Sequence, residues 1–291
     1  MRIANLILLA AVTAGCAPTG SDAPEPEQTQ TSPVVLESPE ATESPAPTDF
    51  SDAPFVYSAS VTGTDFDIIT ASDPTSFCTL EFTGRSQQEM PDKTSDGELF
   101  AEAFTFQANF NHGPSIAFAM DIDFASTAAA EADALRYASR LGKLPFVLRE
   151  GVNRLVVHKG SPDTTAFSDI GLIVLYSANA DRRIQTNDLE ETLLHESVHA
   201  TWDVPHATSA NWQNAQREDN AFVTNYAKSL PELEDLAESV LFAYALIAYP
   251  DRLPPSDAEA INRAIPARIN IIRDLFSTGP QAPADARCPN G

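Results

Sequence analysis

Two histidines and a glutamate form the motif with the clearest chemistry in the 291-residue chain: His195, Glu196 and His199 match the pattern HExxH. On an α-helix, residues four apart are rotated by only about 40° and raised by about 6 Å, so both imidazoles can bind one metal ion. Glu196 is then placed to take a proton from a zinc-activated water and to deliver it to a leaving amine. The motif therefore predicts zinc-dependent hydrolysis.

A hydrolytic zinc site usually has three protein ligands and a water, so a third ligand must come from elsewhere in the chain. The metzincin motif is not completed, because Trp202 and Pro205 stand where it requires glycine and histidine. The remaining histidines have no partner at ligand spacing and are expected to be loop or surface residues: His112, His158 and His206.

The segment EDLAE offers two carboxylates at helical spacing, Glu234 and Glu238, beginning 35 residues after His199. Both lie on one face of the expected helix, so the spacing alone allows either to be the third ligand. Asp203 follows His199 by four residues. It could hydrogen-bond a ligating histidine without touching the metal, cap the helix, or bind the metal as in aspzincins.

Together these segments resemble the gluzincins, whose HExxH helix is followed by an ExxxE or ExxxD helix. The resemblance implies that Glu234 binds zinc and that Glu238 hydrogen-bonds a ligating histidine. Tyr226 stands near the place of the tyrosine that reaches the oxyanion in anthrax lethal factor and its relatives, although it precedes Glu234 by eight residues rather than seven. It is therefore a candidate catalytic residue, with a half-buried packing role as the alternative.

The pattern from about residue 75 to 275 is also similar to an uncharacterised group of secreted bacterial proteins regarded as zinc peptidases. The resemblance implies a zincin-like α+β fold with an N-terminal mixed sheet, the HExxH helix, and a helical C-terminal part. A peptide substrate would pair with a sheet strand at 170–177 and gain backbone hydrogen bonds there.

The elements expected from local patterns agree with an α+β order, in which strands come first and helices last. Ser126 and Gly142 bound a helix as its N-cap and its terminating glycine. Apolar and alternating runs predict strands, and periodic segments from Asn187 onward predict helices. The expected strands span 55–61, 65–70, 79–84, 104–110, 115–124, 154–159 and 170–177, and one of the later helices spans 209–228.

The first 16 residues have the form of a bacterial secretory signal that ends at Cys16. A basic start and an apolar run are typical of such a signal, and the ending Thr-Ala-Gly-Cys resembles a lipobox. The resemblance predicts lipidation of Cys16, with plain secretion as the alternative. Residues 17–54 are rich in Pro, Glu, Ser and Thr and read as a disordered tether, which leaves 55–291 as the catalytic domain. The expected location is the cell envelope, with a lipid anchor as the membrane contact.

Two further cysteines, Cys78 and Cys288, lie near the ends of the folded part. An oxidising compartment favours a disulfide between them, and two unrelated buried thiols are the alternative. Neither belongs to a CxxC pair, so metal binding by these thiols is not expected.

Composition limits the partners of the chain, which carries 41 acidic and 18 basic residues for a net charge of −23. Phosphate binding needs clustered cations, so nucleic acid is not an expected partner. The sequence favours a monomeric zinc metallopeptidase acting on a peptide or protein. The alternatives are a zinc-containing surface lipoprotein that acts by binding, and a zinc hydrolase of another amide, such as a cell-wall bond.

Overall fold

The structure, a computed structural model, describes residues 48–60, 67–95, 99–283 and 286–288, all within the unit 47–291. The expected signal, the lipidation site Cys16 and most of the expected tether lie outside these residues. Among the helices of the described part, none combines the length and apolar character that a bilayer span requires.

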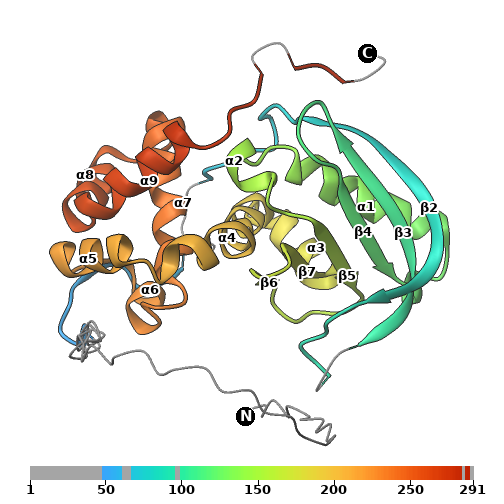
Figure 1. Cartoon of the computed structure of the whole chain (residues 1–291), viewed down its shortest axis with the longest axis horizontal. Helices are drawn as coiled ribbons and strands as arrows, with labels where there is room; N and C mark the ends of the chain where they lie inside the picture. The colour runs from blue at the N-terminus through green and yellow to red at the C-terminus, as the bar shows by residue number, and fades with distance from the viewer. Residues whose placement is uncertain (1–47, 61–66, 96–98, 284–285, 289–291) are drawn as a thin grey trace, which may run out of the picture. The chain divides into compact units, whose positions relative to one another are not determined.

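A six-stranded mixed sheet has the strand order β2, β3, β4, β5, β7, β6 (Figure 1). Strands β2, β3 and β4 pair antiparallel, β4, β5 and β7 pair parallel, and β6 runs antiparallel along the far edge of β7. With the helices described below, this sheet confirms the α+β class. The bounds are β2 Phe77–Glu89, β3 Phe100–Phe110, β4 Ile116–Asp121, β5 Arg154–His158, β6 Thr165–Phe167 and β7 Leu172–Tyr176.

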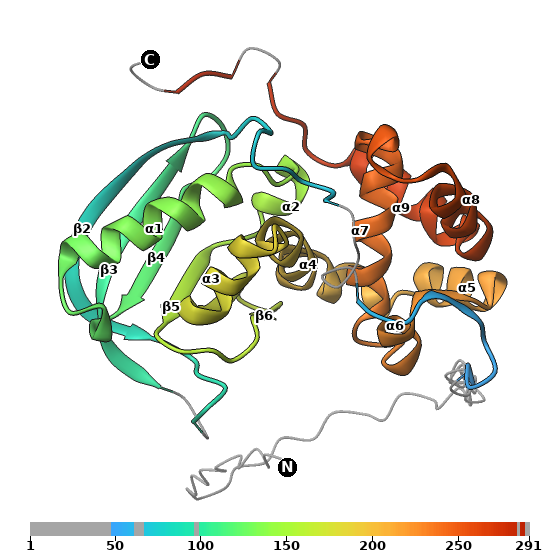
Figure 2. The same cartoon turned by 180° about the vertical axis from the view of Figure 1, so that it is seen from behind.

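The main core lies between one face of this sheet and two helices, α1 (Thr127–Leu141) and α4 (Leu189–Trp202). Helix α1 crosses β2, β3 and β4 (Figure 2). Ser126 caps α1 as expected, because its hydroxyl accepts a hydrogen bond from the Ala129 amide. A smaller apolar cluster covers the opposite face of β5 and β7, which explains their continuous apolar sequences.

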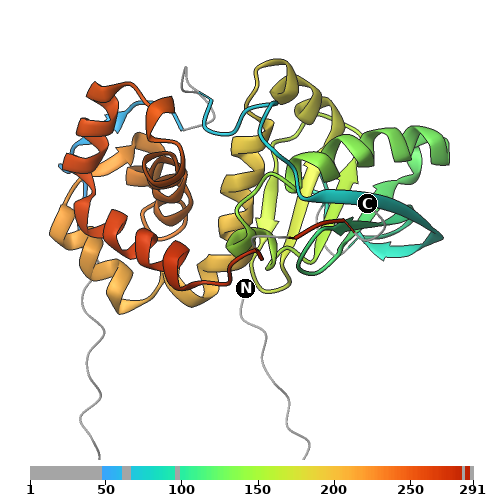
Figure 3. The same cartoon turned by 90° about the horizontal axis from the view of Figure 1, so that it is seen from above.

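The C-terminal part is helical and lies on the side of α4 away from the sheet (Figure 3). A short parallel pair, β1 with β8, belongs to this part and brings the first described residues against it. The remaining bounds are β1 Phe55–Tyr57, β8 Phe222–Thr224, α2 Phe146–Arg149, α3 Ser177–Gln185, α5 Ala210–Asp219, α6 Asn225–Ser229, α7 Asp235–Ala248, α8 Pro255–Ala264 and α9 Pro266–Thr278, with short turns η2 Ile122–Phe124, η3 Asp203–Ala207 and η4 Pro250–Arg252.

A buried ion cluster holds three of these helices together. The guanidinium of Arg268 on α9 lies 3.0 Å from Asp219 at the end of α5 and also contacts Asp235 at the start of α7. All three side chains are fully buried. Loss of this ion pair would leave a buried charge unpaired, which is strongly destabilising. Asp235, the first residue of α7, is therefore held in place by Arg268.

The strands expected over 55–61 and 115–124 end earlier, at Tyr57 and Asp121, and two further elements differ in kind. The helix expected over 209–228 ends at Asn220, whose left-handed backbone (φ 43°) terminates α5 and allows β8 to form. The expected strand over 65–70 is absent from its described residues, 67–70. There the amides of Ile68 and Ile69 donate to the Glu191 carboxylate on α4, at 2.6 and 2.9 Å, instead of joining a sheet.

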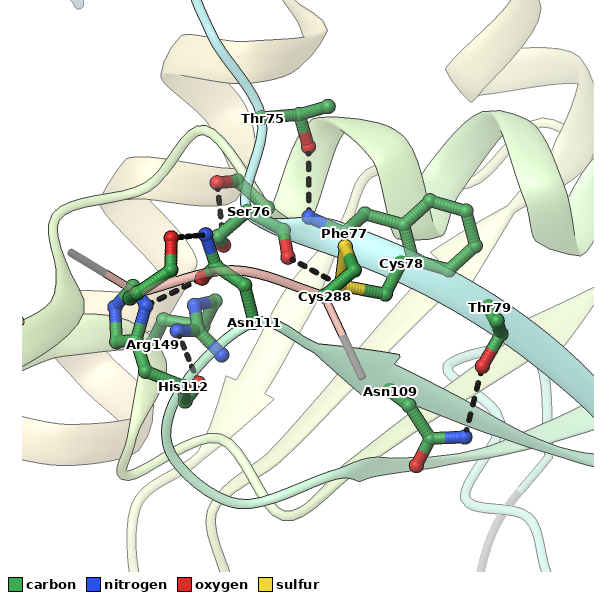
Figure 4. The surroundings of a disulfide bond; sticks show 12 residues. Thr75, Ser76, Phe77, Cys78, Thr79, Asn109, Asn111, His112, Arg149 and Cys288 are labelled. Carbon is green, nitrogen blue, oxygen red and sulfur yellow. Dashed lines mark hydrogen bonds between the residues drawn. A yellow bond between two sulfur atoms is a disulfide. The ribbon is translucent and has the colours of Figure 1, made fainter. Parts of the chain in front are cut away.

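The two ends of the described part are fastened to the fold. Cys78 on β2 forms a disulfide with Cys288, the pairing favoured by the sequence, and the Asn111 amide reaches the Ala286 carbonyl nearby (Figure 4). At the other end, Phe50 is buried against Phe222 with ring centroids 5.1 Å apart. Packing therefore begins a few residues before the domain start expected at residue 55.

Candidate functional site

Helix α4 carries the HExxH motif through the middle of the described fold. It begins after Asp188 and is buried on almost every side, because it packs on α1, α7 and the sheet. His195 and Glu196 are 9% and 7% exposed. The rings of His195 and His199 lie side by side, with centroids 4.8 Å apart, as the four-residue spacing predicts.

The third member of the group is Glu234, at the start of α7. Its Oε2 lies 3.3 Å from His195 Nε2 and 3.2 Å from His199 Nε2, and the two Nε2 atoms are 3.1 Å apart. Among the described residues, His195, His199 and Glu234 form the one group of this kind that could hold a metal ion. The choice of Glu234 over Glu238 therefore agrees with the geometry.

The close approach of imidazoles and carboxylates shifts the pKa values of this group. Burial opposes the charged form of His195, but the carboxylates of Glu234 and Glu238 outweigh burial and raise its pKa to about 10. For His199, burial is likewise outweighed by Asp203 and Glu234, and the pKa is about 9. The pKa of Glu234 is held well below its usual range, since both imidazoles counter its burial. The carboxylates thus stabilise positive charge on the two imidazoles.

Glu238 stands behind His195 and contacts the side of the ring away from Glu234. Its Oε1 is 3.2 Å from His195 Nδ1, and the carboxylate is fully buried. The hydroxyls of Ser60 and Thr224 donate to its two oxygens at 2.6 and 2.7 Å. No local sequence signal identifies these two hydroxyls, because each comes from a different segment that tertiary packing brings to α7.

Asp203 has the corresponding position behind His199. Its Oδ2 lies 2.8 Å from His199 Nδ1, while His199 Nε2 faces Glu234. The chain continues from α4 into the π-helical turn η3, which keeps Asp203 on the same face as His199. Of the three roles considered for Asp203, the structure shows two: it is the C-cap residue of α4, and its carboxylate contacts Nδ1 of His199.

Two adjoining hollows, of about 420 and 250 Å³, open beside the histidine pair, and together we call them the cleft. Glu196 lines both hollows, and burial raises the pKa of its carboxyl. Tyr226 from α6 also lines both, and its pKa is raised by burial and by the neighbouring Glu234 carboxylate. The residues common to the two hollows are Lys93, Thr164, His195, Glu196 and Tyr226.

The other three histidines lie outside this group, as the sequence analysis expected. His112 packs on Phe146, and His206 lies against Trp202 beyond the end of α4. His158 is not a surface residue, however. It is 4% exposed, with Nε2 2.9 Å from the Pro91 carbonyl.

The strand expected to align a substrate is not at an edge. The segment 170–177 forms β7, which is paired on both sides, with β5 and with β6. The edge strand on this side of the sheet is β6, which has only three residues and therefore no clear sequence pattern. Thr165 and Ala166 of β6 line the smaller hollow, next to His195 and His199.

In comparisons with known proteins, no family model, no curated protein and no solved structure matches the chain.

Proposed function

We propose that the protein is a zinc-dependent metallopeptidase of the gluzincin type, with a zincin-like fold. One observation carries the proposal: three ligand atoms from His195, His199 and Glu234 converge to within 3.1–3.3 Å of one another, beside the buried carboxyl of Glu196. The sequence motif and this convergence are independent, because Glu234 comes from a separate helix.

The donor set fits zinc. Zinc in proteins takes nitrogen and oxygen ligands at about 2.0–2.2 Å in a tetrahedral arrangement, so neighbouring ligand atoms lie about 3.3–3.6 Å apart. The three separations in this protein, 3.1, 3.2 and 3.3 Å, are close to that spacing. Two imidazole nitrogens and one carboxylate oxygen also leave one position for a water or a substrate oxygen, as hydrolytic sites require.

The carboxylates behind the histidines suit the same function. A ligating histidine usually gives its other ring N–H to a carboxylate, which fixes the tautomer and the ring orientation. Glu238 faces Nδ1 of His195, and Asp203 faces Nδ1 of His199. Nδ1 of His199 hydrogen-bonds Asp203 at 2.8 Å, whereas Nδ1 of His195 lies 3.2 Å from Glu238 and has no hydrogen-bond partner among the described residues. Each Nε2 is left to bind the metal.

When bound, zinc would supply a Lewis acid that polarises a carbonyl and acidifies a water. Glu196 is not a ligand, and its carboxylate accepts the proton of the attacking water and later delivers it to the leaving amine. Tyr226 can donate its phenolic hydrogen to the oxygen on which negative charge develops. Burial supports the work of Glu196, because it raises the pKa of this carboxyl and so makes its carboxylate a stronger base.

The substrate we propose is an extended peptide or protein segment that pairs with the free side of β6. Backbone pairing gives affinity with little demand on sequence. Lipidation at Cys16, outside the described residues, would hold the domain at the cell envelope, where its substrates would then be found.

Digestion of an unbiased peptide library by the zinc-loaded protein tests this proposal. We expect cleavage by the wild type and none by Glu196→Gln, which should still bind one zinc because Glu196 is not a ligand. Zinc loss in Glu196→Gln would contradict the assignment of Glu196 as the base. Stoichiometric zinc in the wild type without cleavage of any peptide would contradict the peptidase and favour a binding protein.

A further inference from the structure

Lys93 brings a positive charge into the cleft of an otherwise acidic protein. Its side chain lines both hollows together with His195 and Glu196. The ammonium donates to the carbonyl of Thr164 at 2.9 Å, and Thr164 directly precedes the edge strand β6. The charge therefore lies where a peptide paired with β6 would pass the metal ligands.

The backbone that carries Lys93 is anchored by the sheet. The Lys93 amide donates to the hydroxyl of Tyr176 at 2.7 Å, and the same hydroxyl donates to Asp92 at 2.6 Å. Two residues earlier, the Pro91 carbonyl lies 2.9 Å from the buried His158 ring. Unlike a lysine on a mobile loop, Lys93 starts from a fixed position, which lowers the entropic cost of using its charge for binding.

Lys93 acts electrostatically on the nearby Glu196 carboxyl, whose pKa its charge lowers, but it forms no close ion pair among the described residues. Its ammonium has three donors, and the hydrogen bond to Thr164 uses one. No carboxylate of the described residues lies within 4.0 Å of it. Arg183 lines the larger hollow as well, but its guanidinium faces Asp163 and Asp188.

The chain has four lysines, and the other three are engaged elsewhere. Lys143 pairs with Glu190, while Lys159 and Lys228 lie over the rings of Phe124 and Phe55.

We propose that Lys93 selects a substrate carboxylate close to the scissile bond. This inference rests on the proposed peptidase function and names the substrate class of its site. The carboxylate can belong to an Asp or Glu side chain or to the C-terminus of a peptide, since both present the same group to an ammonium. The net charge of −23 repels strongly acidic peptides, so the preference should concern one position of an otherwise neutral or basic peptide.

The cleavage profile of a peptide library gives the first test. If the selected group is a side chain, the wild type should cleave peptides with Asp or Glu enriched at one position beside the scissile bond. If it is a C-terminal carboxylate, cleavage should occur close to free C-termini and should stop when these are amidated. Lys93→Met should lose the preference in the cuts that it makes, and Lys93→Glu should favour Lys and Arg at that position. The control Lys159→Met removes a lysine outside the cleft and should keep the wild-type profile.

Binding without turnover gives the second test. A labelled acidic peptide and its Gln or amide counterpart are titrated onto zinc-loaded Glu196→Gln, with and without Lys93→Met. We expect the acidic peptide to bind about 3- to 10-fold more tightly, a difference that disappears with Lys93→Met and shrinks at high salt, as for a partly exposed ion pair.

The outcomes separate the two proposals. Peptide cleavage with no acidic preference, or with a preference that survives Lys93→Met, would overturn the role of Lys93 and leave the peptidase intact. Absence of any cleavage by the wild type would overturn the peptidase itself, and the substrate role of Lys93 with it.

Discussion

Glu191 should make the stability of the fold depend on pH. This carboxyl lies on α4, 2% exposed, and one oxygen accepts the amides of Ile68 and Ile69. The other oxygen is buried with no hydrogen-bond partner among the described residues. Burial outweighs the amide hydrogen bonds and raises the pKa of Glu191 from 4.5 to about 7.

The stability of the fold should fall as the pH rises, because the folded state retains the Glu191 proton after the unfolded chain has lost it. Below about pH 4.5 the carboxyl is protonated in both states, and its contribution to stability is complete. As the pH rises through about 7, the unfolded chain has already released the proton, and the folded protein must ionise a buried group. The contribution is therefore lost, by about 2 to 3 kcal/mol between about pH 5 and pH 8.

The variant Glu191→Gln isolates this effect. Its amide oxygen can still accept the Ile68 and Ile69 amides, and it has no proton to lose. Urea unfolding of both proteins at several pH values, with the same zinc concentration, should show the variant gaining about 2 to 3 kcal/mol on the wild type from about pH 5 to 8. Glu131→Gln, which removes an exposed carboxylate on α1, serves as the control. Parallel curves for wild type and Glu191→Gln would refute the reasoning.

Two further predictions concern the cleft and the C-terminal segment. Tyr226→Phe should lower kcat by about 100-fold, because it removes a hydrogen-bond donor to the developing oxyanion. Its zinc affinity should stay unchanged, because Tyr226 is not a metal ligand. Steady-state kinetics and a zinc titration check both points, and an unchanged kcat or a loss of metal would contradict them. Replacing Cys78 and Cys288 together by Ser should lower the free energy of unfolding, measured in urea, by up to about 5 kcal/mol, since their disulfide closes a loop across a sequence separation of 210 residues. Equal stability of the variant and the wild type would show that packing alone holds the C-terminal segment.

The parts that the sequence predicts well depend on local patterns. The HExxH spacing places His195 and His199 together on any helix, and Ser126 caps α1 through its own backbone geometry. The pairing of Cys78 with Cys288 needed only an even cysteine count after Cys16 and an oxidising compartment.

The parts that the sequence does not predict depend on distant segments. Ser60 and Thr224 hold Glu238 only because β1 pairs with β8, and this pairing has no local signature. The apolar residues Ile68 and Ile69 resemble a strand, yet their amides bond to a carboxylate 123 and 122 residues away. Lys93 likewise enters the cleft through contacts with Tyr176 of β7.

The zinc affinity of Glu234→Ala and Glu238→Ala, measured against a competing chelator beside the wild type, tests the proposed metal site most directly. The wild type should bind one zinc. Glu234→Ala should lose most of its affinity, because Oε2 of Glu234 is the carboxylate oxygen that lies beside both Nε2 atoms, at 3.2 and 3.3 Å. Glu238→Ala should lose only about 10- to 100-fold, as expected when a carboxylate that orients a ligating histidine is removed. A metal-free Glu238→Ala beside a zinc-loaded Glu234→Ala, or a wild type that binds no zinc, would contradict the site.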